Sequence, residues 1–352
     1  MKSPRDLLRK SALVIAPPVL AVLAALAVGA IIILFTGENP LSAYGALFVG
    51  AFGSIQALAD TLEKATPYLF GGLAFLLAAR AGLFNIGVEG QMYAGAIVAA
   101  ILGFVLHGLP PVVHVLIVLA GAALAGGAFA ALPAVLKVRR NVHEVISTMM
   151  LNYIAYAMTA YLTVHVFADA GAVAQTPPVL PSAVLTALLP PSRLNSGFLI
   201  AVVLAVLLWV FLFKTPGGFD LRIIGLNRTA AEYAGVNSRR VVELAFLGSG
   251  VVAGLMGAER VLGVYGRFIN AFSPGYGFTA IAVSLLAANN PLGVIPAAIL
   301  FGALENGGSA MSLMMNVPRE LGLILEALII VFIAGENFFR HELQRMAARR
   351  AS

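Results

Sequence analysis

The sequence predicts an all-α protein that crosses a membrane many times as a helical bundle. Hydrophobic residues make up 60% of the 352-residue chain and charged residues only 11%, which leaves too little polar surface for a soluble domain of this size. Apolar runs of about 15 to 25 residues recur along the chain, and such lengths match the thickness of a bilayer. The 36 glycines agree with this class, because small residues let helices approach closely in lipid. Gly250 and Gly254 show the four-residue spacing of that kind of contact.

About ten apolar segments are expected to cross the membrane. They are residues 12–35, 66–79, 91–107, 112–136, 146–168, 197–213, 243–263, 278–289, 292–306 and 319–335. The first segment follows four basic residues, as a signal peptide would, but its 24 residues are too many for a signal core and suit a retained span. The segments 66–79, 278–289 and 292–306 are short for a full crossing, so we expect broken or re-entrant helices.

The basic residues predict the orientation of these spans. With a cytoplasmic N-terminus, 17 of the 22 Lys and Arg residues fall in cytoplasmic segments, which is the usual bias of short inner loops. The chain then divides into a cytoplasmic segment 1–11, a transmembrane domain 12–335 and a cytoplasmic basic tail 336–352. Residues 36–65 and 169–196 become long outer segments. The second is rich in proline and is either a simple connection or an ordered cap on which a partner docks.

The largest inner segment, 214–242, contains a pattern typical of a short helix. Asn227 is a suitable N-cap for a helix that runs through Thr229 to Ala234, and Gly235 is a suitable stop. A short helix with a small-residue face on the cytoplasmic side is either a docking element or an ordinary amphipathic turn, and the pattern alone leaves both open.

A polar, glycine-rich segment from Arg80 to Gln91 separates two apolar runs. Backbone that leaves helical geometry at membrane depth must be buried in protein or line a watery cavity. Arg80, Asn85 and Glu89, spaced among three glycines, therefore indicate a pathway or a gate.

Four blocks, in order along the chain, resemble the permease subunits of bacterial ABC importers for simple sugars and nucleosides. They read AGLFNIGVEGQMYAGA, NVHEVISTMMLNYIA, GLNRTAAEYAGVNSRRV and GYGFTAIAVSLLAANNPLGVIPAAILFGALENGGSAM. Ribose-type permeases carry Asp-Leu-Ser where this chain has Asn85-Ile86-Gly87, and they lack the run from Val88 to Gln91. Branched-chain amino-acid permeases share an Asn-like start and differ after it. The resemblance, which runs from about residue 60 to 335, is therefore nearest to the nucleoside branch.

This resemblance implies alternating access driven by a separate ATPase subunit. The chain has no G-x-x-x-x-G-K-[ST] phosphate loop, so ATP and Mg²⁺ belong to that partner and no enzymatic activity, cofactor or metal is expected in this chain. In such importers the segment that matches 230–238 forms a coupling helix seated on the ATPase. The implied coupling residues are Ala230, Ala231, Glu232, Tyr233, Ala234, Gly235 and Arg239.

The resemblance also implies the other partners. They are a second permease subunit, with a heterodimer preferred over a homodimer, and an extracytoplasmic binding protein, either soluble or lipid-anchored. The location implied is the bacterial inner membrane, and the cargo is a nucleoside or a sugar. No nucleic-acid partner is expected, because the net charge of +6 comes from basic residues gathered in inner loops.

A nucleoside needs hydrogen-bonding groups and an aromatic face for its base, and polar residues at membrane depth usually face a cavity or one another. The candidate pathway residues are Phe84, Asn85, Glu89, Asn152, Glu305 and Asn306. The structural alternative is that the carboxylates form ion pairs, namely Glu89 with Arg80, Glu259 with Arg260 or Arg267, and Glu305 with Arg319.

Two other function classes stay open. An ion-coupled secondary transporter would also have broken helices and would need a buried carboxylate, for which Glu89 or Glu326 is available. An intramembrane enzyme would need a nucleophile or a metal cluster. The chain has no cysteine, and the sequence shows no arrangement of Ser, His and Asp that would serve.

Overall fold

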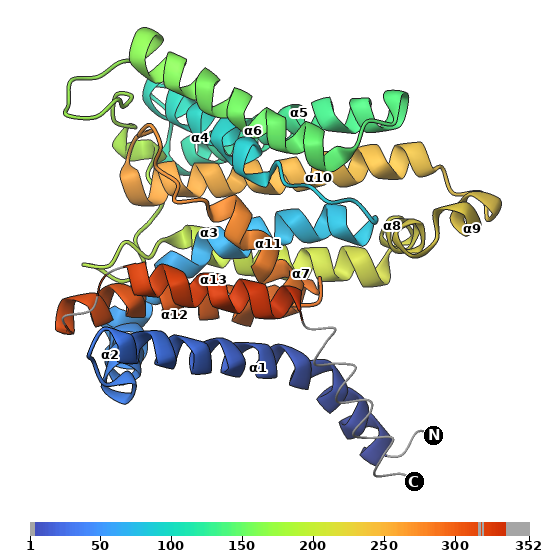
Figure 1. Ribbon diagram of the computed structural model, residues 1–352. Helices are drawn as coiled ribbons and strands as arrows, with labels where there is room; N and C mark the ends of the chain where they lie inside the picture. The colour runs from blue at the N-terminus through green and yellow to red at the C-terminus, as the bar shows by residue number, and fades with distance from the viewer. Residues whose placement is uncertain (1–3, 316–317, 319, 336–352) are drawn as a thin grey trace. The chain divides into compact units, whose positions relative to one another are not determined.

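The computed structural model describes residues 4–315, 318 and 320–335 and is almost wholly helical there (Figure 1). Its elements are α1 (Pro4–Phe35), α2 (Pro40–Phe52), α3 (Ile55–Arg80), α4 (Val88–Val105), α5 (Pro111–Arg140), α6 (Glu144–Tyr161), η1 (Leu162–Val166), η2 (Pro181–Ala183), α7 (Ser196–Lys214), α8 (Pro216–Leu226), α9 (Arg228–Tyr233), α10 (Ser238–Glu259), η3 (Arg260–Tyr265), α11 (Tyr276–Leu286), α12 (Pro291–Met314) and α13 (Glu320–Ala334). Two isolated β-bridges are the strand-like pairings in these residues. The all-α class is confirmed.

The chain forms two compact units. Unit 1 contains residues 1–61 and 303–352, and unit 2 contains residues 62–302. In unit 1, α1 packs along α13, and the chain turns by 117° between α1 and α2. Ile33, Ala43, Met311 and Leu321 form its buried core. The hydroxyl of Tyr44 donates to the carbonyl of Leu26 at 2.6 Å and fixes α2 against α1.

Unit 2 is built around α4, which packs against α5, α6, α10 and α11. The most extensive packing between two helices is that of α10 against α5 (Figure 1). It depends on small residues: a Cβ atom added to Gly254 would lie under 3.0 Å from the carbonyl of Ala122, closer than real Cβ atoms approach. Two helices thus come within backbone contact, and the spacing of Gly250 and Gly254 in the sequence reflects this packing.

Replacing Gly254 with Ala is expected to destabilise the protein by about 1–3 kcal/mol, because the new methyl group forces α10 away from α5. Gly248→Ala is the matched control on the same helix, since the nearest atom to its added Cβ is a Leu77 side-chain carbon at 3.5 Å. Thermal unfolding in detergent would compare the two. Equal melting temperatures would contradict the close-packing argument.

All ten predicted apolar segments fall on helices, although the ends differ by several residues. Within the described residues, six helices are long and apolar enough to cross a membrane by themselves, or seven if the bent pair formed by α1 and α2 counts as one span. The count of ten therefore stays a prediction. The predicted tail 336–352 and Arg319 lie outside the described residues.

Two helices were missed because they lie between the apolar runs. The predicted outer segment 36–65 contains α2 and the first turns of α3, and the predicted inner segment 214–242 contains α8 before the expected short helix. Both missed helices begin with a capping residue followed by proline. The side chain of Asn39 accepts from the backbone N–H of Leu41, and the hydroxyl of Thr215 accepts from that of Gly218. Such N-cap and N1 pairs were the available signal.

The proline-rich segment 169–196 is ordered and packs on its own unit. The backbone N–H groups of Val179 and Leu185 donate to the carbonyls of Gly266 and Leu262, at 2.8 and 3.1 Å. Gln175 forms a β-bridge with Ile269. The segment is therefore an ordered cap over the end of α10, as one of the two sequence alternatives proposed.

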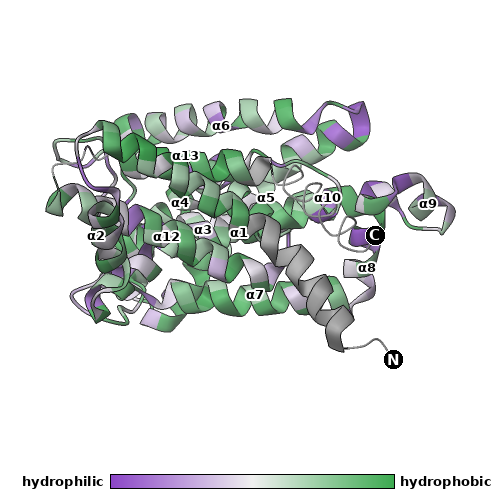
Figure 2. Cartoon of the chain, turned by 60° about the horizontal axis from the view of Figure 1, so that its bottom comes forward, coloured by the Kyte–Doolittle hydropathy of each residue, from purple (hydrophilic) through white to green (hydrophobic). Residues whose placement is uncertain are grey.

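The outward faces of unit 2 are apolar, as lipid contact requires. On α7, Leu199, Val203 and Leu207 are exposed large hydrophobic residues. Figure 2 shows hydrophobic colouring along most of α7 and hydrophilic colouring gathered around α9. In water such a surface would aggregate, so these faces are suited to a bilayer.

Candidate functional site

The polar break between α3 and α4 is the centre of the candidate site. α3 ends at Arg80, and Gly82 turns the chain with a φ of +73°, a value that favours glycine. The chain then runs without regular structure to Gly87 and enters α4 at Val88. Phe84, the predicted aromatic contact, is 40% exposed and meets the ring of Phe75 edge-on at 5.0 Å.

Arg80 and Glu89 hold the two ends of the short helix α11. Nε of Arg80 donates to the carbonyl of Asn289 at 2.7 Å, just beyond the C-terminal end of α11. Oε2 of Glu89 accepts from the backbone N–H of Gly277 at 2.5 Å, in the first turn of α11. The two side chains satisfy backbone groups at the ends of α11 that lipid cannot satisfy. The predicted ion pair between Arg80 and Glu89 was wrong, because each side chain binds α11 instead.

This arrangement ties the break to both ends of one short helix. α11 has 11 residues, so its two ends lie about 16 Å apart at a rise of about 1.5 Å per residue. Because Arg80 binds one end and Glu89 the other, the segment between them spans the length of this helix.

Asn85 and Asn152 hold the backbone of the break in place. Oδ1 of Asn85 accepts from the N–H of Gly87 at 2.9 Å, and its amide group donates to Ser249 on α10 at 2.8 Å. Asn152, on α6, accepts from the N–H of Gly90 at 2.8 Å and donates to the carbonyl of Ile86 at 3.0 Å. Both side chains are buried. In this conformation the predicted pathway residues bind protein groups, and their contact with substrate stays a prediction.

A buried charge cluster lies at the start of η3. Arg260 is 1% exposed and contacts two carboxylates, Glu259 and Glu63, each at 2.7 Å. The amide of Asn195 also donates to Glu259, at 2.8 Å. The predicted pairing of Glu259 with Arg260 is confirmed, and Arg267 pairs with Asp169 instead. Glu63 was missed because it lies 197 residues away in the sequence.

The last two candidates, Glu305 and Asn306, belong to unit 1. The amide nitrogen of Asn306 donates to the carbonyls of Gly50 and Ala57 and to the hydroxyl of Thr61, at 3.0–3.1 Å. Asn306 thus joins α12 to the corner between α2 and α3. The structure does not bring these two residues together with Asn85 and Glu89 in one unit, and the pairing of Glu305 with Arg319 falls outside the described residues.

The predicted short helix of the inner segment is confirmed as α9. The side chain of Asn227 accepts from the backbone N–H of Ala230 at 3.0 Å, and Gly235 ends the element with a φ of +87°. Ala231 is buried against unit 2, whereas Tyr233 is 90% exposed. Of the predicted coupling residues, Tyr233 is therefore a large side chain presented outward without a ring contact in the described part of the chain.

Glu232 connects α9 to the start of α10. Its carboxylate accepts from the hydroxyl of Ser238 and from Nε of Arg228, the latter at 3.1 Å. These bonds, that of Ser238 first, lower the pKa of Glu232 below its usual value. The contact is therefore present at neutral pH and is lost only as the pH falls through that lowered pKa. Glu232 and Arg228 therefore form a half-exposed ion pair on α9.

An aromatic cluster that the sequence did not reveal lies beside the break. Tyr93, one turn beyond Glu89 on α4, stacks on Phe272 at 4.8 Å and meets Tyr156 edge-on at 4.8 Å. Tyr156 and Phe272 are half-buried. The faces of these rings come from three separate parts of the chain, so spacing along the sequence could not show them.

The sequence profile of a family described as "Branched-chain amino acid transport system / permease component" matches residues 57–334. The chain belongs to this permease family. Its helical architecture and apolar outer faces are accordingly those of a multi-pass membrane transport component rather than of a catalytic subunit.

Three relatives extend this result over nearly the whole permease. The guanosine ABC transporter permease protein NupP of Bacillus subtilis (strain 168) is 39% identical over 95% of this chain and 97% of its own length. The glucose ABC transporter permease protein TsgB13 of Haloferax volcanii is 35% identical over 92% of this chain and 88% of its own. The nucleoside ABC transporter permease protein NupB of Lactococcus lactis subsp. cremoris is 32% identical over 95% of this chain and 94% of its own length. The resemblance to sugar and nucleoside permeases is confirmed.

Proposed function

We propose that this permease forms the membrane pathway of an ABC importer for nucleosides. The observation that carries the proposal is the 39% identity to a guanosine permease over 95% of the chain. A pathway for nucleosides also suits the groups near the break. Tyr156 and Phe272, which pack on the buried Tyr93, are half-buried aromatic rings suited to a base, while Phe84 is exposed beside the buried amides.

The proposed mechanism is alternating access, in which the break between α3 and α4 moves together with α11 as the pathway opens. The bonds of Arg80 and Glu89 to the ends of α11 tie that helix to the break. A movement of α11 therefore requires a movement of the segment 81–87, and the buried amides of Asn85 and Asn152 define the resting position of that segment. This role replaces the ion-coupled transporter as the explanation for the buried carboxylate.

ATP hydrolysis in this proposal belongs to a partner subunit that seats α9. The support is the exposed Tyr233, the half-exposed ion pair of Glu232 with Arg228 and the N-cap of α9 by Asn227. The remaining partners proposed are an extracytoplasmic substrate-binding protein and a second, different permease subunit. The location proposed is the bacterial inner membrane with both termini cytoplasmic.

Glucose is the second candidate cargo, because one relative of 35% identity is a glucose permease. Uptake of radiolabelled guanosine, adenosine, uridine and glucose should be measured in a strain that lacks this gene and in the complemented strain. We expect nucleoside uptake to fall to background and to return on complementation, with glucose uptake unchanged. Normal nucleoside uptake alongside lost glucose uptake would reverse the assignment.

A further inference from the structure

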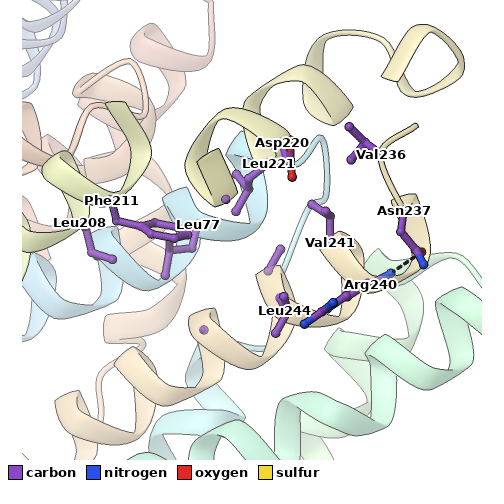
Figure 3. A pocket seen from close by; sticks show the side chains of 13 residues that line it. Leu77, Leu208, Phe211, Asp220, Leu221, Val236, Asn237, Arg240, Val241 and Leu244 are labelled. Carbon is purple, nitrogen blue, oxygen red and sulfur yellow. Dashed lines mark hydrogen bonds between the residues drawn. The ribbon is translucent and has the colours of Figure 1, made fainter. Parts of the chain in front are cut away.

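A cavity of about 650 Å³ opens in unit 2 between α3, α7, α8 and α10. This volume lies within the range of about 300–1,000 Å³ that is typical of pockets for small molecules. Leu208 and Phe211 lie at one end of the cavity, and Asp220, Asn237 and Arg240 lie toward the other end, with Leu244 next to Arg240 (Figure 3). None of the residues between α3 and α4 lines it.

The cavity has the depth and the opening of a lipid site. Along α10 it extends from Arg240 to Gly248, which is about 12 Å at a rise of about 1.5 Å per residue. That depth covers most of one leaflet, half of a core of roughly 30 Å. Phe211 and Leu244 are exposed large hydrophobic residues, so part of the apolar lining is open at the surface of the unit.

Two residues of α7 near the cavity indicate where its polar residues lie relative to the membrane–water interface. Nζ of Lys214 lies 5.7 Å from the ring of Trp209, close to the cavity on α7. Trp and Lys at the end of an apolar helix are typical of the membrane–water interface. The polar wall formed by Asp220, Asn237 and Arg240 therefore lies near the headgroups, while the apolar wall lies among the acyl chains.

The two charges of the cavity have opposite sign and come from different helices. Asp220 is on α8 and Arg240 on α10, and neither side chain forms an ion pair within the described residues. The amide oxygen of Asn237 accepts from the backbone N–H of Arg240 at 3.1 Å, which leaves the guanidinium group available (Figure 3). A ligand that satisfies both charges needs an anion and a cation, and the apolar lining suits an attached apolar chain.

We propose that this cavity binds a zwitterionic aminophospholipid of the phosphatidylethanolamine type. Arg240 binds the phosphate, Asp220 accepts hydrogen bonds from the ammonium group, and an acyl chain lies against Leu208, Phe211 and Leu244. An anionic lipid such as phosphatidylglycerol has no ammonium group to offer Asp220. The site is separate from the nucleoside pathway, and the proposal does not depend on that assignment.

The test uses the full-length permease, purified with its co-purifying subunits in nanodiscs that contain equal amounts of phosphatidylethanolamine and phosphatidylglycerol. Bound lipid is quantified by native mass spectrometry. We expect phosphatidylethanolamine to be retained roughly five-fold over phosphatidylglycerol. Asp220→Asn should abolish that preference, and Arg240→Gln should reduce retention of both lipids. Lys214→Gln, at the same level but outside the cavity, is the matched control and should keep the preference.

Three results would overturn the proposal. The first is equal retention of the two lipids by the unaltered protein. The second is a preference that Asp220→Asn leaves unchanged in correctly folded protein. The third is equal protection against thermal unfolding by soluble phosphoethanolamine and by phosphatidylethanolamine, which would identify the ligand as the free headgroup compound rather than a lipid.

Discussion

Replacing Arg260 with Met is expected to lower the free energy of unfolding by about 3–5 kcal/mol, because two buried carboxylates then face each other without their cation. Glu63 and Glu259 both contact Arg260 at 2.7 Å, and all three side chains are buried. A loss of that size is a large fraction of a net stability of about 5–15 kcal/mol. The measurement is thermal unfolding and monodispersity of the permease in mild detergent.

Arg267→Met is the matched control for this prediction. Arg267 pairs with Asp169 at 3.1 Å, and both side chains are partly exposed, so the loss should be about 1 kcal/mol or less. Adding Glu63→Gln and Glu259→Gln to Arg260→Met should recover much of the lost stability, since no buried charge is then left unpaired. Equal melting temperatures for the Arg260 and Arg267 variants would show that the buried cluster does not have this role.

Replacing Tyr233 with Asp is expected to abolish substrate-stimulated ATPase activity in the assembled transporter without removing the permease from the membrane. Tyr233 is 90% exposed at the end of α9, so its loss leaves the folding of unit 2 intact. A large apolar side chain in this position suits a pocket on a partner, and such anchors dominate binding energy. The measurement is ATP hydrolysis by the complex in nanodiscs, with and without the loaded binding protein.

Tyr233→Phe keeps the ring and should retain most of the stimulated activity. Glu232→Arg should also uncouple the complex, but it removes the bonds to Ser238 and Arg228 as well and so tests α9 less cleanly. Full stimulation in Tyr233→Asp, with normal amounts of the permease in the membrane, would place the ATPase contact elsewhere.

The sequence predicted the features that depend on local signals. Asn227 and Gly235 define α9 through their own side chain and backbone, so the helix could be placed before the fold was known. The same logic would have found α2 and α8, because Asn39-Pro40 and Thr215-Pro216 are also helix starts. Those two helices were not predicted because they are not long apolar runs.

The contacts of the candidate site could not be predicted in the same way. Helices that are apolar on all sides have no polar face to show which side turns inward. The choice of partner for Glu89 therefore depends on the rotation and depth of α4 relative to α11. It binds Gly277, 188 residues away, rather than Arg80 at the other end of the same break.

By itself the sequence determined that this protein is a polytopic helical membrane protein, with a glycine-rich break and a short capped helix between Asn227 and Gly235, and its resemblance to a known family indicated a permease. Composition, the length of apolar runs and helix caps can all be read from the sequence without knowledge of which distant residues pack together. Only the tertiary structure decided that Arg80 and Glu89 hold opposite ends of α11 and that Arg260 joins Glu259 to Glu63. In a membrane a buried polar group must find a partner, and which partner it finds is set by how the helices pack.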